Sequence, residues 1–392
     1  MRLLVSCPAS YGDFHPLIPL ARACQAAGHE VAFASDESAR PQVERLGFDF
    51  FPAGGDWRGL VRERHPELTI PPSEGQMPIM DAAVFAGARI EVTLPALLEV
   101  CKAWRPDVLL RSHLAFAGCL AAEELGIPHA ALNAYASGHL ISRQDNVREP
   151  LNRWRAARGL PPDPELRMLY RYLELIPFPP SLRHPDAPLL PTSRRIQPLI
   201  FSDSRGEALP EWMDDLPPGP VVHATLGTVA DRPDLLRTII EGLADEPLTL
   251  IVATGPRRDP RTLGALPPNV RVAAYISHEQ LLPRCDAIIT HAGAGTLIAS
   301  INLGLPLVLI PMFGDQFANA EMAEAAGVAL ILQPSTITPA AVREATYALL
   351  NEPRHQQFSA LRQEIASLPP VERAVGWLER IARDRAPLSL EA

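Results

Sequence analysis

Two short stretches of the sequence combine residue types that could carry out acid–base and phosphate chemistry. The first, SYGDFHPLIPLA (10–21), follows a hydrophobic run and places Asp13 and His15 where a strand should give way to a helix. Either side chain could serve as a general base, because carboxylates and imidazoles both accept protons from substrate hydroxyls. The structural alternatives are that Asp13 caps the helix and that His15 faces solvent at the helix start.

The second stretch, AIITHAGAGTLIAS (287–300), has the pattern of a strand, a glycine-rich turn and a helix start. Gly293 and Gly295 would let a ligand approach the backbone, and the helix start offers free N–H groups to a phosphate. His291 and Thr296 add an imidazole and a hydroxyl donor. The third glycine of the dinucleotide fingerprint and the Walker lysine are missing, so neither a dehydrogenase nor an NTPase is favoured. A tight turn without a ligand is the alternative.

Strands and helices alternate around both stretches. In the first half we predict strands at 2–7, 29–35, 48–53, 107–112 and 128–134, and helices at 16–27, 38–46, 90–104 and 115–125. In the second half we predict strands at 220–227, 248–255, 270–275, 287–291, 306–311 and 329–332, and helices at 233–244, 278–284, 295–303, 316–326 and 339–351. This alternation predicts an α/β fold of two doubly wound, Rossmann-like domains with parallel sheets. We expect the domains to face each other across a cleft, with ligands at the carboxyl ends of the strands.

The domain boundaries follow from changes in composition along the 392 residues, a length that suits two domains. We expect an N-terminal domain over 1–201, a linker over 202–219 and a C-terminal domain over 220–371. The helical tail 372–392 is expected to pack back on the N-terminal domain. Residues 135–200 are rich in proline and arginine, and we predict only short helices there, at 148–158 and 163–174.

Composition excludes several classes of protein. With 47% hydrophobic and 21% charged residues the chain is an ordinary globular protein. Its net charge of −9 argues against a nucleic-acid partner. No apolar run reaches the roughly 18–20 residues of a membrane helix, and the run before Cys7 is too short for an export signal. The 5 cysteines, without CxxC spacing, suggest reduced, partly buried thiols and a cytoplasmic location.

Residues 270–330 resemble the donor-binding region of family-1 glycosyltransferases of the GT-B fold. The motifs that carry the resemblance are His-x-Gly-x-Gly-Thr, Gly-x-Pro and an Asp-Gln pair, within THAGAGTLIASINLGLPLVLIPMFGDQ. In the N-terminal half the GDFHPLIPLA turn and RPDVLL…ELGIP also fit. The nearest resemblance is to bacterial natural-product enzymes that use nucleotide-activated deoxysugars.

The resemblance implies a donor site built from two strand ends and the segments near them. It implies that the diphosphate is held by His291, Gly293, Gly295 and Thr296, with Thr225, Gly227 and Thr228 near the phosphates. It implies that Asp315 and Gln316 bind sugar hydroxyls, that Tyr275 stacks on the base and that the backbone of Ile276 reads it. This sequence departs from the family at Tyr275, where Trp is common, and at Ser277-His278, where Pro-Gln is usual. Thymine and uracil therefore both stay open, and Tyr275 could instead be a half-buried strand aromatic.

The resemblance also selects between the two candidate bases. The family turn is Gly-His-x-x-Pro, or Gly-Asp-x-x-Pro in a subset, so Gly12 and Pro16 place Asp13 at the base position. Members with a histidine base usually have a carboxylate after the DVLL-type strand, where this chain has Ser112. Because a carboxylate of ordinary pKa is a weak base, Asp13 suits a phenolic or otherwise acidified acceptor, or a carbon nucleophile. His15 stays the competing candidate.

These features predict an inverting glycosyltransferase that moves a sugar from a dTDP or UDP carrier to a small hydrophobic, polyketide-like or aromatic acceptor. We expect no cofactor and no metal, since the sequence has no metal-ligand spacing and the helix dipole, His291 and Thr296 could neutralise the diphosphate. The irregular segments 54–90 and 135–175 would line the acceptor site, with Trp57, Met77, Met80, Phe85 and Tyr135 as candidates. The alternatives are a nucleotide-sugar epimerase of the same fold and a non-catalytic auxiliary protein. Whether the chain forms a homodimer stays open.

Overall fold

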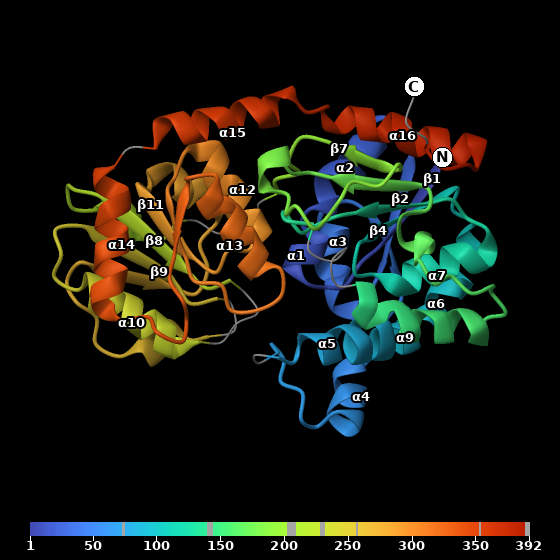
Figure 1. Cartoon of the computed structure of the whole chain (residues 1–392), viewed down its shortest axis with the longest axis horizontal. Helices are drawn as coiled ribbons and strands as arrows, with labels where there is room; N and C mark the ends of the chain where they lie inside the picture. Colours follow the sequence, from blue (N-terminus) through green and yellow to red (C-terminus); the bar gives the residue numbers. More distant parts are fainter. Residues whose placement is uncertain are drawn as a thin grey trace. The chain divides into compact units, whose positions relative to one another are not determined.

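A computed structural model describes residues 1–72, 75–138, 144–201, 209–227, 232–255, 258–352 and 354–388. The chain divides into two compact units (Figure 1). Unit 1 comprises Met1–Pro179, Arg183–Phe201 and Leu368–Ala392, and unit 2 comprises Pro180–Leu182 and Ser202–Ser367. Thr228 and much of the expected linker lie outside the described residues.

Unit 1 is built on a seven-stranded parallel sheet with the strand order β3-β2-β1-β4-β5-β6-β7. Its strands are β1 (Arg2–Ser6), β2 (Glu30–Ser35), β3 (Asp49–Pro52), β4 (Val108–Ser112), β5 (His129–Leu132), β6 (Leu173–Ile176) and β7 (Ser193–Arg195). The helices that cover it include α1 (Tyr11–Phe14), α2 (Leu17–Ala26), α3 (Arg40–Arg45), α6 (Arg89–Trp104), α7 (Phe116–Leu125) and α9 (Gln144–Ala157). Successive residues of a strand point to opposite faces. Leu3 and Val5 accordingly join one core cluster, and Leu4 joins the other.

The C-terminal helix α16 (Val371–Asp384) belongs to unit 1, where it packs against α2 (Figure 1). Ala374, Val375, Leu378 and Ile381 form its buried face. These side chains recur at the three- and four-residue spacing of one helix stripe, so burying that stripe fixes the tail to the domain that begins the chain.

Unit 2 is built on a six-stranded parallel sheet with the strand order β10-β9-β8-β11-β12-β13. Its strands are β8 (Val221–Thr225), β9 (Thr249–Ala253), β10 (Val270–Ala273), β11 (Ala287–Thr290), β12 (Leu307–Leu309) and β13 (Ala329–Ile331). Its helices are α10 (Pro233–Leu243), α11 (His278–Leu281), α12 (Ala294–Leu303), α13 (Gln316–Ala325), α14 (Pro339–Asn351) and α15 (His355–Ser367). Both sheets thus have the doubly wound order 3-2-1-4-5-6, which confirms the predicted α/β class.

The predicted helix over 163–174 is wrong. Only a 3₁₀ turn, η3 (Arg167–Tyr170), forms there, and strand β6 follows it. Leu173 and Leu175 of that strand are completely buried in the sheet. The pairing of β6 with β5 and β7 extends unit 1 beyond the strands that the sequence predicts.

The segment 54–90 is also more regular than expected. It contains α4 (Trp57–Arg64), α5 (Met77–Ile79) and a π-helical segment, η2 (Met80–Ala88), that runs directly into α6. α4 packs on η2, and a small core of Val61, Leu68, Met80, Val84 and Ala88 lies between them. Of the proposed acceptor residues, Met80 is therefore a core residue.

Two further observations bear on location and redox state. All 5 cysteines are free and buried thiols. Within the described parts of the chain, no helix is both long and apolar enough to cross a membrane.

Candidate active site

The carboxylate of Asp13 lies where the strand order of unit 1 reverses. Asp13 belongs to α1 directly after β1, and Ser112 ends the neighbouring strand β4. The Ser10 hydroxyl donates to Asp13 Oδ2 at 2.5 Å, and the Ser112 hydroxyl donates to Oδ1. Each carboxylate oxygen thus has one hydroxyl partner, which fixes the orientation of the group. Ligands of open α/β sheets bind at such a reversal point.

A buried arginine holds the loop that carries Ser112. The Arg111 side chain is completely buried, and its Nη1 donates to the carbonyls of Ser112 at 3.3 Å and His113 at 2.9 Å. Its Nη2 donates to the carbonyl of Leu169. The end of β4 is therefore fixed from within the core. The sequence offered Ser112 as the replacement for an acid, and the structure makes it a direct partner of Asp13.

The competing base, His15, is packed among rings. Its Nε2 lies 3.1 Å from the Gln42 amide nitrogen, and its ring lies 4.9 Å from that of Tyr11 and 5.1 Å from that of Phe201. The side chain is half-buried rather than facing solvent. These contacts hold the His15 ring at the start of α2.

A glycine-lined turn occupies the equivalent reversal point of unit 2. Thr225 ends β8, Thr290 pairs with it at the end of β11, and the segments Leu226–Gly227 and His291–Gly293 follow these strands. The imidazole of His291 fills the space between the two turns. A Cβ at Gly227 would lie 2.7 Å from His291 Cε1, and one at Gly293 would lie 2.5 Å from Nε2. Glycine at both positions is therefore required by the imidazole.

The turn also contains a strained residue. Ala292 has φ +64°, a conformation that costs a non-glycine residue about 1–3 kcal/mol. The Asn319 side chain donates to the Ala292 carbonyl at 3.1 Å and to Asp315 Oδ2 at 2.6 Å. Asn319 is completely buried, and it joins the turn to the start of α13. Sequence reasoning missed Asn319, although its place one helical turn after Asp315 was a signal.

Three histidines lie together in this unit. Burial, together with the neighbouring His278, lowers the pKa of His291 to about 4. His223 is completely buried, its ring lies 5.5 Å from that of His278, and its Nδ1 donates to the Ile251 carbonyl at 3.0 Å. Burial lowers the pKa of His223 to about 3 and that of His278 to about 4. All three imidazoles are neutral at pH 7, and Nδ1 of His291 lies 3.2 Å from the Thr290 hydroxyl.

The two residues of the predicted sugar-binding pair, Asp315 and Gln316, differ in the hydrogen bonds that their side chains make. Gln316 Oε1 accepts from the backbone N–H groups of Met312 at 2.9 Å and Phe313 at 3.2 Å. These bonds use the carbonyl and leave the NH₂ group as the part that could meet a sugar hydroxyl. The Asp315 carboxylate is half-buried and is held by Asn319.

The other predicted donor residues lie around the same sheet edge. Tyr275 and Ile276 follow β10, which ends at Ala273, earlier than predicted; Tyr275 is half-buried and Ile276 is buried. Thr296 lies in the first turn of α12, and Gly295 faces open space, since a Cβ there would meet nothing within 4 Å. The Thr225 hydroxyl accepts from the Gly227 N–H at 3.3 Å. Among the described residues, no three His, Cys, Asp or Glu side chains are arranged to hold a metal ion.

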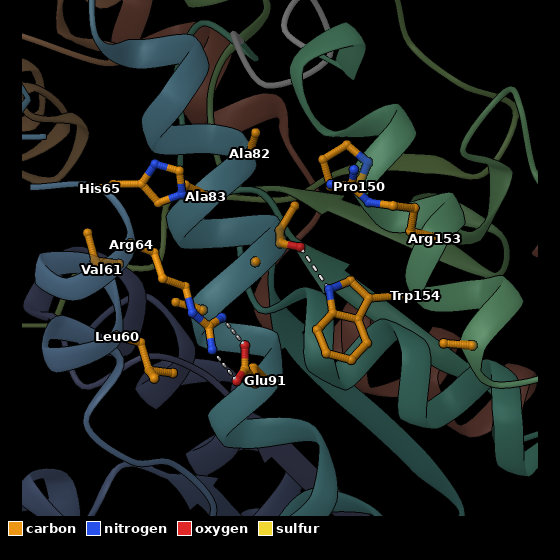
Figure 2. A pocket seen from close by; sticks show the side chains of 14 residues that line it. Leu60, Val61, Arg64, His65, Ala82, Ala83, Glu91, Pro150, Arg153 and Trp154 are labelled. Carbon is orange, nitrogen blue, oxygen red and sulfur yellow. Dashed lines mark hydrogen bonds and ion pairs between the residues drawn. The ribbon is translucent and has the colours of Figure 1, made fainter. Parts of the chain in front are cut away.

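A separate pocket of about 370 Å³ lies between α4, η2, α6 and α9 (Figure 2). Arg64 and Glu91 form an ion pair in it at 2.6 and 2.9 Å, and Trp154 Nε1 donates to the Ala86 carbonyl at 3.0 Å. Its lining comes from both segments predicted to bind the acceptor. However, the lining includes neither Asp13 nor the five side chains proposed from the sequence.

The fold and the similarity to characterised relatives define the class: the protein is a glycosyltransferase of the GT-B fold. It belongs to the erythromycin biosynthesis protein CIII-like family, whose N-terminal domain model matches residues 22–227 and whose C-terminal domain model matches 242–381.

Characterised relatives and solved structures agree with this assignment. Tylactone mycaminosyltransferase of Streptomyces fradiae is 28% identical over 97% of this chain and 92% of its own length. The 3-alpha-mycarosylerythronolide B desosaminyl transferase of Saccharopolyspora erythraea is 26% identical over 98% of this chain and 99% of its own. The spinosyn rhamnosyltransferase SpnG complexed with thymidine diphosphate superposes with a TM-score of 0.78 at 24% identity, covering 97% of this chain and 100% of that one.

Proposed function

We propose that this chain transfers a deoxysugar from a dTDP or UDP carrier to a small natural-product acceptor, with inversion and without a metal ion, and that Asp13 is the general base. The observation that carries the proposal is the pair of reversal-point sites, a hydroxyl-held carboxylate in unit 1 and an imidazole set between glycines in unit 2. The activities named for the relatives support the sugar class, and the thymidine diphosphate in the SpnG structure supports the carrier.

The chemistry assigned to each site follows from its charges. As the acceptor oxygen attacks the anomeric carbon, its proton moves to Asp13 and the bond from that carbon to the diphosphate breaks. The electron pair stays on the diphosphate, where the His291 N–H and the start of α12 offset the charge. A single displacement inverts the anomeric centre.

The Asp13→Asn variant tests the base. Asparagine keeps an oxygen that can accept from Ser10 or Ser112 but cannot take the proton. We expect kcat to fall by about 10²–10⁴-fold while the affinity for the nucleotide sugar stays unchanged. The matched control, His15→Gln, is expected to retain turnover. Near-normal turnover in Asp13→Asn would remove Asp13 from the chemistry.

Substrate panels test the remaining steps. Calorimetric titration with dTDP- and UDP-sugars should show binding of at least one of the two carriers, and mass spectrometry should then show an acceptor heavier by one sugar. A product with the mass of the donor would favour the epimerase. Binding of no nucleoside diphosphate would overturn the whole proposal.

A further inference from the structure

The guanidinium of Arg89 lies close to two aromatic rings in unit 1. Its Cζ is 4.6 Å from the centre of the Trp57 ring and 4.9 Å from that of the Phe85 ring. Arg89 is the first residue of α6, and Phe85 lies four residues earlier in the π-helical segment η2. π-Helical segments are rare in proteins, and those that occur often lie at functional sites.

The donors of this guanidinium have no partner in the described structure. Nε and Nη1 of Arg89 are buried and make no hydrogen bond to any described residue. Burial lowers the pKa of Arg89, and the charge of Arg58 lowers it further. The buried Arg111 and Arg155, by contrast, donate to backbone carbonyls, and Arg155 also pairs with Glu123. An unpaired buried cation costs free energy that an anion would recover.

The proposed catalytic carboxylate lies close enough to Arg89 for its charge to act on the guanidinium. The charge of Asp13 acts on Arg89 and opposes the effect of burial, as does Tyr135, which follows β5. In the described structure no hydrogen bond joins Asp13 to Arg89, and the Asp13 oxygens accept from the hydroxyls of Ser10 and Ser112. The anion that would pair with Arg89 therefore has to come from elsewhere.

We propose that Arg89 binds an anionic oxygen of an aromatic acceptor, a carboxylate or an ionised phenol next to the hydroxyl that receives the sugar. This rests on the proposed function, because it takes the acceptor to be bound at Asp13. Both rings lie within cation–π distance of the guanidinium, and its N–H groups are the donors that an anionic oxygen would meet. Arg89 is thus a specificity-determining residue.

The test measures binding alone, by calorimetry with the full chain. The probes are 1-hydroxy-2-naphthoate, its methyl ester, and the more acidic phenol 4-nitro-1-naphthol with 1-naphthol as its neutral match. The variants are Arg89→Met, which keeps the packing volume and loses the charge, and Arg89→Lys, which keeps the charge. The control is Arg64→Met, because Arg64 is an exposed arginine of the same helical layer that already pairs with Glu91.

Wild type and Arg64→Met are expected to prefer at least one anionic probe over its neutral match by about tenfold or more. Arg89→Met should bind both members of that pair alike, with the affinity for the neutral probe unchanged, and Arg89→Lys should keep part of the preference. Preference for the naphthoate assigns the site to a carboxylate, and preference for the nitronaphthol assigns it to a phenolate.

Two outcomes would overturn the assignment: a wild type that binds no anionic probe better than its match, or a preference that survives in Arg89→Met. A role of Arg89 in packing alone would lower the affinity for both members of each pair equally. The proposed function fails in a different way, by absence of sugar transfer to any acceptor, and that readout is independent of these titrations.

Discussion

The two reversal-point sites lie at the same place in similar sheets, but they are built from different groups. In unit 1 a charged side chain, Asp13, is oriented by hydroxyls from two segments of the chain. In unit 2 the space is shaped by backbone, since Gly227 and Gly293 leave room for a neutral imidazole. This difference fits the proposed roles, because a general base needs a charged group held in one orientation, whereas a diphosphate needs hydrogen-bond donors around an open space.

The two sites also differ in the buried residues that hold them. In unit 1, Arg111 donates to the backbone carbonyls of Ser112 and His113, next to Asp13. Behind His291 stand two further imidazoles, His278 and His223, whose lowered pKa values keep them uncharged. The proposed donor side is therefore expected to be sensitive to acid.

The largest expected effect is the loss of folding stability at low pH, where His223 must take up a proton. Its pKa is about 3 in the folded chain against 6.5 for an ordinary histidine, so between these values the unfolded chain binds more protons. Stability therefore rises with pH in this window. The contribution of His223 to the free energy of unfolding is complete above about pH 6.5. It falls as the pH drops toward 3, by about 3 kcal/mol between pH 7 and pH 4.

Thermal unfolding across this pH range checks the prediction. His223→Asn keeps a donor for the Ile251 carbonyl and removes the titrating group, so its melting temperature should depend less on pH than that of wild type. His355→Asn, at an exposed position at the start of α15, is the control that should follow wild type. Identical pH slopes in His223→Asn and wild type would contradict the assignment.

The next largest effect is expected on nucleotide affinity, when a side chain enters the space that Gly227 and Gly293 leave for the His291 ring. The Cβ of Gly293→Ala would lie 2.5 Å from His291 Nε2, so the imidazole must move out of the turn. We expect the affinity for dTDP or UDP, measured by calorimetry, to fall by about 10–100-fold, the worth of a hydrogen bond to a charged group. An unchanged affinity would mean that the imidazole takes no part in binding.

The donor side could be read from the sequence because its parts are contiguous. His291 and Gly293 lie between strand β11 and helix α12, and Thr296 lies in the first turn of that helix. Residues this close in the sequence also lie close together in the structure, so the sequence motif predicts the spatial arrangement. The doubly wound order follows in the same way from buried apolar runs that alternate with helices. His223 escaped notice because it is one polar residue inside an apolar strand, and only the neighbouring strands show what its ring meets.

The contacts of the proposed acceptor side could not be read in this way, although Trp57 and Phe85 were candidates from the sequence. Trp57, Phe85 and Arg89 meet only because α4 packs on the π-helical segment, and no local pattern predicts that contact. Likewise, the bond from Ser112 to Asp13 depends on β4 lying beside β1, across 99 positions of sequence. The strand β6 was misassigned as a helix because its short apolar run has no strict periodicity.

A smaller effect is expected from removing one support of the carboxylate. Ser112→Ala deletes the hydroxyl at Asp13 Oδ1 and leaves that of Ser10 at Oδ2. We expect kcat to fall about five- to tenfold with little change in KM, because one hydrogen bond of about 1 kcal/mol is lost. Ser112→Thr should restore turnover, since it returns the hydroxyl. If Ser112→Ala matched wild type, the orientation of Asp13 would rest on Ser10 alone.

The smallest effect is expected from Gly295→Ala. This variant tests whether Gly295 is needed for the fold or leaves room for the ligand. Gly295→Ala adds a Cβ that meets nothing within 4 Å, in the first turn of α12, so it should raise stability by about 0.4–1 kcal/mol. If a diphosphate lies against this backbone, the same methyl group takes up its space, and the affinity for dTDP or UDP should fall severalfold. A more stable protein that binds less tightly is the expected result, whereas Gly293→Ala, whose Cβ would clash with His291, is expected to lose affinity without a gain in stability. Higher stability with full affinity would move the ligand away from Gly295 and leave the cradle to His291 and Thr296.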